Sequence, residues 1–520
     1  MRGARVHAPA FYMYDESELP LHHASLLHCM HAGEKHSILD NQHATGFWLH
    51  MQLRRHCART RNSDHADLFV VPFWLLASWA IGDCRGTHHL QRVSELLRSL
   101  NRTGLFRQQA RRHLLPSSTF MTREPPTYGV FTRNASSQQG CFKAWARFAG
   151  FGYLPKDAQL ERVFSRMIIA HMERLPRRPS QLCNVSVPGF SAARMYPSWP
   201  PPWWHGQTLV LPYVVDAKTT ELARTSEATI FDYVQWMRRP HTFFFAGNVL
   251  RNGAAAYVRT ALSKLNQWDD GRVHCSGFVH AARREEWRAE SDGYLARLRN
   301  ASIRSPDTRA LQGQYCLPPL PRFDVLSTMA ASRFCLCPRG DSPSSSRVFY
   351  AIALGCIPII IADPWKRCGS PAPRTPPAVS RHPHFLRSMA MPFHGLIDYE
   401  GFALWLSERA AMNAPGAGVQ ALLEGLGASL FSESTTRQRW RFPTPGSAVS
   451  ERLELRLASM RQALRSALWR LESNELIANL TLATAFQLSG AFPAPPARPR
   501  GVKGVEGGLL SAPGGTTSTP

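Results

Sequence analysis

The sequence contains no long apolar run. No stretch of about 18 consecutive apolar residues occurs, although a membrane-spanning helix needs roughly 20, and residues 1–20 lack the apolar core of a signal peptide. We therefore expect either a soluble protein or a chain from which a membrane anchor is absent.

Two common ligand-binding motifs are also missing. The eleven cysteines include one Cys-x-Cys, at Cys335 and Cys337, but no Cys-x-x-Cys pair, so a zinc site is not expected. No Gly-x-x-x-x-Gly-Lys-Ser/Thr sequence occurs, which excludes a P-loop. Five Asn-x-Ser/Thr triplets favour a secretory lumen, where some cysteines could pair. These triplets begin at Asn101, Asn134, Asn184, Asn300 and Asn479.

Acidic residues are scarce relative to basic ones. The chain has 61 Lys and Arg against 37 Asp and Glu, a net charge of +24. This charge favours polyanionic partners such as nucleic acid, anionic lipid or phosphorylated small molecules, although a compositional preference for arginine explains it equally well. Neither a basic stripe with interleaved aromatic residues nor a nucleic-acid reader motif is present. We therefore expect no nucleic-acid binding.

The remaining composition is typical of a folded protein with more than one core. Apolar residues make up 44% of the 520 residues, enough for two or three folded units. Short apolar strands alternate with amphipathic helices, which predicts parallel sheets and an α/β fold. Strands are expected at residues 10–14, 66–74, 207–216, 241–249, 271–278, 332–338 and 357–363. Helices are expected at residues 93–100, 160–175 and 254–265.

These elements fall into two groups, one on each side of residue 238. We expect an N-terminal domain over residues 1–238, a second domain over 239–410, and a helical segment over 411–490 that packs back on the domains. The Pro- and Trp-rich residues 196–206 are expected to form a loop. The Pro-, Gly- and Ser-rich tail, residues 491–520, is expected to be disordered.

One stretch, "CPRGDSPSSSRVFYAIALGCIPIII" at residues 337–361, combines a polar turn, a helix and a buried strand. The helix has an apolar face at Val348, Ala351 and Ile352, a serine within residues 344–346 can cap it, and Gly355 ends it. The turn therefore lies at the carboxyl end of one strand, the edge where open α/β sheets bind ligands.

Phosphate chemistry suits this turn. The N-terminus of a helix presents unpaired N–H groups, serine hydroxyls add donors, and Arg347 adds a positive charge with a bidentate fork. The pattern is compatible with a diphosphate site. The pattern alone favours an ordinary capped helix with a solvent-facing arginine, because strand–turn–helix units with serine caps are common.

The same stretch resembles the signature of exostosin-type glycosyltransferases, Cys-Leu-x-Pro-x-Gly-Asp-Ser-x-x-Ser-x-Arg followed by Gly-Cys-Ile-Pro. Other family elements are matched in the expected order by "FYMYDESELP" from Phe11, "ADLFVVPFW" from Ala66, "FFFAGN" from Phe243 and "MPFHGLIDYEGFALWLSE" from Met391. The resemblance covers roughly residues 8–410 and is strongest over residues 243–410.

This resemblance implies an inverting glycosyltransferase of the GT-B architecture, with two facing Rossmann-like domains. The C-terminal domain would bind a nucleotide sugar, expected to be a UDP-sugar, and the N-terminal domain would bind a polysaccharide or glycoprotein-glycan acceptor. Enzymes of this architecture usually need no metal, and the resemblance implies no cofactor. The one Asp-x-Asp-like triplet, Asp398–Glu400, is explained by carboxylates that complement a helix dipole.

The resemblance also bears on the compartment and partners. Relatives are typically Golgi proteins held by an N-terminal helix, so a Golgi lumen is implied, with membrane contact only through an anchor absent from this chain. A homo- or hetero-oligomer is compatible with the family.

Seven residues are candidates for binding substrate. Arg347 is expected to contact the diphosphate, because a cationic cradle stabilises the charge that develops on the leaving group. Arg259, on the helix after "FFFAGN", is either a second cation of the site or a surface arginine. The full candidate set is Arg347, Ser345, Ser346, Arg339, Asp341, Tyr350 and Arg259.

The sequence departs from the family pattern at two places. Tyr350 stands where the family has an Asp or Glu that accepts a hydrogen bond from the nucleotide ribose. Residues 144–154 lack the Asp-His of the family's acceptor-side element. An inverting transfer needs a general base, for which Asp83, Asp15 and Glu16 are candidates, although each is also typical of a loop carboxylate. The alternative function is a catalytically impaired glycan-binding or partner subunit.

Overall fold

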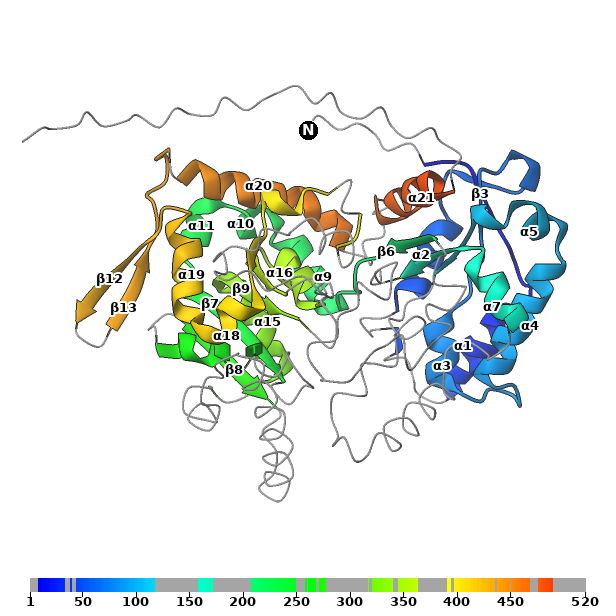
Figure 1. Cartoon of the computed structure of the whole chain (residues 1–520), viewed down its shortest axis with the longest axis horizontal. Helices are drawn as coiled ribbons and strands as arrows, with labels where there is room; N and C mark the ends of the chain where they lie inside the picture. Colours follow the sequence, from blue (N-terminus) through cyan, green and yellow to red (C-terminus); the bar gives the residue numbers. More distant parts are fainter. Residues whose placement is uncertain are drawn as a thin grey trace, which may run out of the picture.

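The computed structural model contains two α/β units, each built on an all-parallel sheet (Figure 1). The expected loop at 196–206, the tail at 491–520, residues 144–154 and the candidate Asp341 lie outside the described residues. The structure describes residues 8–32, 38–39, 44–116, 158–171, 207–248, 258–259, 261–267, 271–276, 317, 320–339, 345–362, 391–393, 397–434, 437–448, 450–467 and 476–489.

The first sheet has six strands in the order β2-β1-β3-β4-β5-β6, and every neighbouring pair is parallel. Its strands are β1 (Phe11–Met13), β2 (Arg59–Thr60), β3 (Leu68–Val70), β4 (His113–Pro116), β5 (Ile168–His171) and β6 (Gln207–Val210). Its helices are α1 (His23–Ala32), α2 (Thr45–Arg54), η2 (Ser63–His65), α3 (Leu75–Ile81), α4 (His89–Arg102), α5 (Gly104–Gln109), η3 (Ala110–Arg112) and α7 (Ala158–Ser165). Strand β3 is buried along its whole length, which explains its uninterrupted apolar sequence.

The second sheet has five strands in the order β11-β10-β9-β7-β8, again all parallel. Its strands are β7 (His241–Asn248), β8 (Gly271–Ser276), β9 (Ser332–Pro338), β10 (Ile357–Ile361) and β11 (Leu404–Leu406). Its helices are α9 (Ala217–Thr225), α10 (Glu227–Ile230), α11 (Tyr233–Met237), η10 (Ser263–Gln267), α15 (Arg322–Ala330), α16 (Arg347–Ala353), η11 (Tyr399–Gly401), α18 (Glu408–Asn413) and α19 (Pro415–Glu424). The predicted α/β class with parallel sheets is therefore confirmed.

The last part of the chain connects the two units. It contains an antiparallel hairpin, β12 (Ser429–Ser434) with β13 (Arg437–Arg441), followed by α20 (Ser450–Ala467) and α21 (Leu476–Leu488). Helix α20 packs on α16 and β10 of the second unit, whereas α21 packs on α2 and β6 of the first (Figure 1). Tyr213 and Val215 already belong to the core of the second unit. The domain bounds that the sequence suggests stay a prediction.

One expected helix, residues 160–175, is wrong over its second half. Helix α7 ends at Ser165, and β5 then occupies Ile168–His171 between β4 and β6. Ile168 and Ile169 are fully buried there. β-Branched residues suit a strand that is covered on both faces, and the helical spacing of the apolar residues concealed the change of element.

The helix of the signature stretch ends as expected. Gly355 has a φ of 65°, its N–H donates to the Ile352 carbonyl at 3.3 Å, and the Cys356 N–H donates to the Ala351 carbonyl at 2.9 Å. These two bonds satisfy carbonyls that the last helical turn leaves open. A side chain at position 355 would also overlap the Ile230 carbonyl. Both the positive φ and this close approach therefore require glycine at position 355.

Within the described part of the chain, two disulfides join neighbouring elements. Cys29 of α1 pairs with Cys84 after α3, and Cys335 of β9 pairs with Cys356, which precedes β10. Among the residues with described positions, no helix combines the length and the apolar content that crossing a membrane requires.

Candidate functional site

The strand order of each sheet reverses at one place. In the second sheet, β7 and β9 are adjacent, whereas β8 lies outside β7 and β10 lies outside β9. The chain therefore leaves the carboxyl ends of β7 and β9 in opposite directions, and such a switch point is where open α/β sheets bind ligands. The first sheet has the same kind of switch point between β1 and β3.

Arg347 lies across the switch point of the second sheet. It is the first residue of α16, and its Nε donates to the carbonyl of Ala246, near the carboxyl end of β7, at 3.1 Å. Its guanidinium also lies over the ring of Phe245, with 5.0 Å between Cζ and the ring centroid. Gly247 leaves room for it, because a Cβ at position 247 would overlap Arg347 Nη2.

Two further candidate arginines lie at the same edge. Arg339 follows β9, and its backbone N–H donates to the carbonyl of Ile361, the last residue of β10, at 2.9 Å. Arg259 is 2% exposed, and its Nη2 donates to the Arg339 carbonyl at 2.9 Å. Arg259 is therefore a buried arginine rather than a surface one. All three arginines thus make backbone hydrogen bonds at the carboxyl ends of the strands β7, β9 and β10.

One carboxylate accompanies these arginines. Glu408, the first residue of α18 after β11, accepts a bond from Arg339 Nη1 at 3.1 Å, and both side chains are largely buried. Because Arg339 is held by this ion pair, its planar fork has a defined orientation. Among the described residues named here, Arg347 and Arg259 leave an excess of positive charge after the Arg339–Glu408 pair is counted.

The serines and Tyr350 have different surroundings. Ser346 occupies the N-cap position of α16 without a side-chain capping bond, so the expected serine cap does not form at this residue. Its backbone carbonyl accepts from the N–H groups of Phe349 and Tyr350 instead. Ser345 is buried, and Tyr350 is half-buried against the core of the second unit.

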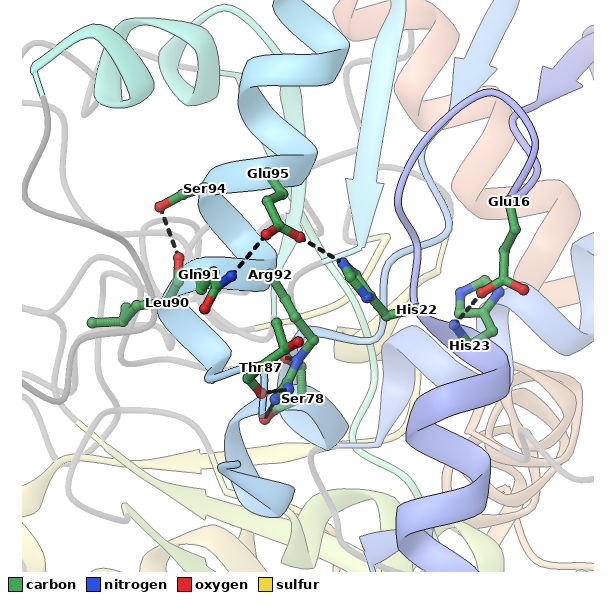
Figure 2. Close-up of polar contacts among 10 residues, drawn as sticks. All are labelled: Glu16, His22, His23, Ser78, Thr87, Leu90, Gln91, Arg92, Ser94 and Glu95. Carbon is green, nitrogen blue, oxygen red and sulfur yellow. Dashed lines mark hydrogen bonds and ion pairs between the residues drawn. The ribbon is translucent and has the colours of Figure 1, made fainter. Parts of the chain in front are cut away.

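A cluster of histidines occupies the switch point of the first sheet. His23, the first residue of α1, bonds through Nε2 to the carbonyl of Pro72, just after β3, at 2.7 Å. Its ring stacks on Trp74 with centroids 4.1 Å apart, and Trp74 Nε1 donates to His50 Nδ1 at 2.9 Å. Glu16, which follows β1, accepts from the His23 backbone N–H (Figure 2). These residues thus gather where β1 and β3 end.

The three general-base candidates are placed differently. Asp83 is exposed after α3 and pairs with His88 at 3.6 Å, so it belongs to a surface loop. Asp15 accepts hydrogen bonds from the N–H and hydroxyl of Ser17, and these bonds lower the pKa of its carboxyl. Glu16 lies at the strand edge, where its carboxylate caps α1.

A buried hydrogen-bond network around Arg92 holds the helices of the first unit together. Arg92 of α4 is 1% exposed and donates to Ser78 Oγ at 2.9 Å and to the Ser78 carbonyl at 2.8 Å (Figure 2). It also donates to the Gly82 carbonyl at 2.6 Å. On the same helix, Glu95 contacts His22 at 3.2 Å. These contacts fix α4 against α3, against Gly82 directly after α3, and against His22 directly before α1.

Metal ligands are not gathered in the described part of the chain. No group of three or more His, Cys, Asp or Glu side chains there has the arrangement of a metal site. Asp398, of the acidic triplet, accepts from the Gly401 N–H at 3.2 Å and caps η11, which is the structural role expected for it.

Sequence reasoning missed two residues of these edges. Glu408 appeared only as the end of a matched segment, although a capping Ser407 directly before it marks the start of a helix after a strand. His23 gave no signal, because only the fold brings it to Pro72, 49 positions along the chain.

Comparison with known proteins agrees with this geometry. Residues 200–422 match the exostosin GT47 domain. The chain is 33% identical over 94 residues to a probable arabinosyltransferase of Arabidopsis thaliana, covering 18% of this chain and 15% of that protein. It is 28% identical over 94 residues to exostosin-1 of Drosophila melanogaster, covering 18% and 9%. It is 60% identical over 37 residues to a probable glucuronosyltransferase of Oryza sativa subsp. japonica, covering 7% and 9%.

The two all-parallel sheets, taken with the exostosin GT47 match, make this chain an α/β protein consistent with the GT-B architecture. The match to the exostosin GT47 domain covers residues 200–422 and therefore includes the arginine-rich edge of the second sheet. The aligned segments span less than a sixth of each curated relative.

Proposed function

We propose that the protein is an inverting glycosyltransferase that transfers a sugar from a nucleoside-diphosphate sugar to a polysaccharide or glycoprotein glycan. The observation that carries the proposal is the convergence of Arg347, Arg339 and Arg259 at the β7/β9 switch point. Ser345 and Ser346 would add donors beside Arg347, and Asp341 stays a candidate from the sequence motif. Tyr350 would contact the nucleotide part of the donor.

The chemistry of the leaving group explains why this edge is cationic. As the bond from the anomeric carbon breaks, negative charge develops on the diphosphate oxygens, and fixed guanidinium groups stabilise that charge more than they stabilise the bound donor. Arg347 can act without a metal because its fork offers two parallel donors to phosphate oxygens. We therefore propose a transfer that does not require a metal ion.

Binding of uridine diphosphate tests the site. Loss of a hydrogen bond to a charged group costs about 1.5–3 kcal/mol, so Arg347→Ala should weaken binding about 10- to 100-fold. Calorimetric titration of the wild type and the variant measures the difference. Arg102→Ala, at the exposed end of α4, serves as the matched control and should bind like the wild type. Unchanged binding of uridine diphosphate by Arg347→Ala would contradict the proposed site.

The donor sugar is proposed from the relatives. Because two of the matched proteins are named as an arabinosyltransferase and a glucuronosyltransferase, UDP-arabinose and UDP-glucuronic acid are the first donors to test. A screen of both against neutral and acidic plant polysaccharides, read out by released uridine diphosphate, would identify the pair that reacts.

Tyr350 supports a second candidate function. A phenol stands where the family has a ribose-binding carboxylate, and it is half-buried against the core. A non-catalytic subunit that binds glycan would account for it. Glycan binding without turnover of any donor, in a protein whose Tyr350→Glu variant gains turnover, would favour this function over the transferase.

The Golgi lumen is the proposed compartment. The disulfides Cys29–Cys84 and Cys335–Cys356 persist only in an oxidising environment. Of the two glycosylation triplets that lie in described residues, Asn101 is exposed, whereas Asn479 accepts from His56 Nε2 at 2.9 Å and is half-buried. Glycosylation at Asn101 alone of these two would fit the fold.

A further inference from the structure

The first sheet offers a base that no family motif assigned. Its β1/β3 switch point is the counterpart of the β7/β9 switch point that holds the arginines, since both sheets place their second strand outside the first. His23, His50, Trp74 and Glu16 lie there. A role for such a base rests on the proposed transferase function, because an inverting transfer requires a base on the acceptor side.

The hydrogen bonds fix the tautomer of each histidine. The Pro72 carbonyl can only accept, so His23 Nε2 must carry the proton and His23 Nδ1 must hold a lone pair. Trp74 Nε1 can only donate, so His50 Nδ1 is already used as an acceptor and its proton is on Nε2. Of the two rings, 4.8 Å apart, only that of His23 offers a basic nitrogen.

The surroundings keep His23 neutral but able to take a proton. Burial is the main cause that lowers its pKa, and the neighbouring His22 and Arg54 act in the same direction. The bond to Pro72 and the charge of Glu16 oppose that change. The residue is only half-buried, and its Nδ1 makes no hydrogen bond to any residue that the structure describes. A neutral imidazole beside a carboxylate suits a general base.

We propose that His23 is the general base that deprotonates the acceptor hydroxyl, with His50 Nε2–H as a donor to the same sugar. The acceptor O–H proton passes to His23 Nδ1 while the acceptor oxygen bonds to the anomeric carbon. The bond from that carbon to the diphosphate oxygen breaks, and its electron pair leaves with the uridine diphosphate. The imidazolium, beside Glu16, then returns the proton to water.

Replacing His23 by glutamine tests the role of His23 as a base separately from its role in holding the structure. In His23→Gln the amide can still donate to Pro72, but no basic nitrogen remains. Transfer, followed as uridine diphosphate released in the presence of acceptor, should fall about 100- to 10,000-fold, the range contributed by a general base. Binding of uridine diphosphate and the unfolding temperature should stay as in the wild type. His28→Gln, exposed on the same helix, is the matched control and should keep full activity. A His23→Gln rate within about threefold of the wild type would overturn the proposal, since a general base contributes far more.

A second measurement does not depend on turnover. In ¹⁵N-histidine NMR spectra of the full chain at neutral pH, the signal that disappears in His23→Gln should show a bare Nδ1 and a protonated Nε2. A proton on Nδ1 would overturn the assignment of the base. Failure of the wild type to bind uridine diphosphate would instead count against the proposed transferase function, so the two failures can be told apart.

Discussion

At the scale of single residues, the arginine edge depends on the absence of a side chain at position 247. Gly247 lies beneath the guanidinium of Arg347, and a Cβ there would overlap Arg347 Nη2 and approach Phe245 Cζ to 2.8 Å. The flexible arginine is the group that can yield. A methyl group at this position therefore probes the location of Arg347 without deleting its charge.

Gly247→Ala should weaken binding of uridine diphosphate about 10- to 100-fold, because the displaced Arg347 loses the same charged hydrogen bonds as in Arg347→Ala. Calorimetric titration checks this. Gly104→Ala, at a helix start where a Cβ meets open space, should bind normally. Equal affinities for the wild type and Gly247→Ala would mean that Arg347 does not act from the position described.

Residue roles were only partly predictable from the sequence. Arg347 was predicted because its signature motif surrounds it, and the fold puts it at a strand edge. Arg259 could equally have been a surface arginine until its 2% exposure was known. Glu408 and His23 act through partners 69 and 49 positions away, and such pairings depend on tertiary structure alone.

At the scale of elements, His113 joins three parts of the first unit. It begins β4, and its Nδ1 donates to the Gln109 carbonyl at the end of α5 at 2.9 Å, while Nε2 lies 2.9 Å from the Tyr14 hydroxyl after β1. Its ring stacks on Phe69 of β3 with centroids 4.8 Å apart. Burial lowers the pKa of His113 to about 4, so the folded protein keeps this ring neutral.

The stability of the fold should therefore fall with acid over a defined window. The unfolded chain takes up a proton on His113 near pH 6.5 and the folded chain near pH 4, so stability is fully present above pH 6.5 and is lost as the pH falls toward 4. This residue alone contributes about 3 kcal/mol to that change.

Urea unfolding between about pH 7 and pH 4 measures this dependence. His113→Gln, which cannot titrate, should show a change in unfolding free energy about 3 kcal/mol smaller over that range. His65→Gln, an exposed histidine of η2, should retain the dependence of the wild type. An unaltered slope in His113→Gln would show that this histidine is not held neutral.

The sequence predicted whether a segment is a helix or a strand wherever the spacing of its apolar residues was clear. β9 was predicted with the bounds that it has in the structure, because Pro338 and the polar turn end its apolar run. The helix expected at 160–175 failed where a buried strand has the same apolar content as a helix face. Strand β4 was not expected at all, since its four residues follow a helix without a turn signal.

At the scale of the whole molecule, two parallel sheets present equivalent edges with opposite chemistry. The edge of the second sheet holds arginines, and that of the first holds neutral histidines with Glu16. The alternation of strands and helices predicted both sheets, whereas the relation between their switch points became apparent only from the strand order. A transferase needs such a pair of edges, one for the leaving diphosphate and one for the acceptor.

The most direct measurement is the release of uridine diphosphate by the wild type, Arg347→Ala and His23→Gln, with UDP-arabinose or UDP-glucuronic acid and a panel of polysaccharides. We predict acceptor-dependent release by the wild type, loss of both binding and release in Arg347→Ala, and loss of release with retained binding in His23→Gln. Absence of acceptor-dependent release by the wild type with every donor, alongside measurable glycan binding, would contradict the transferase function.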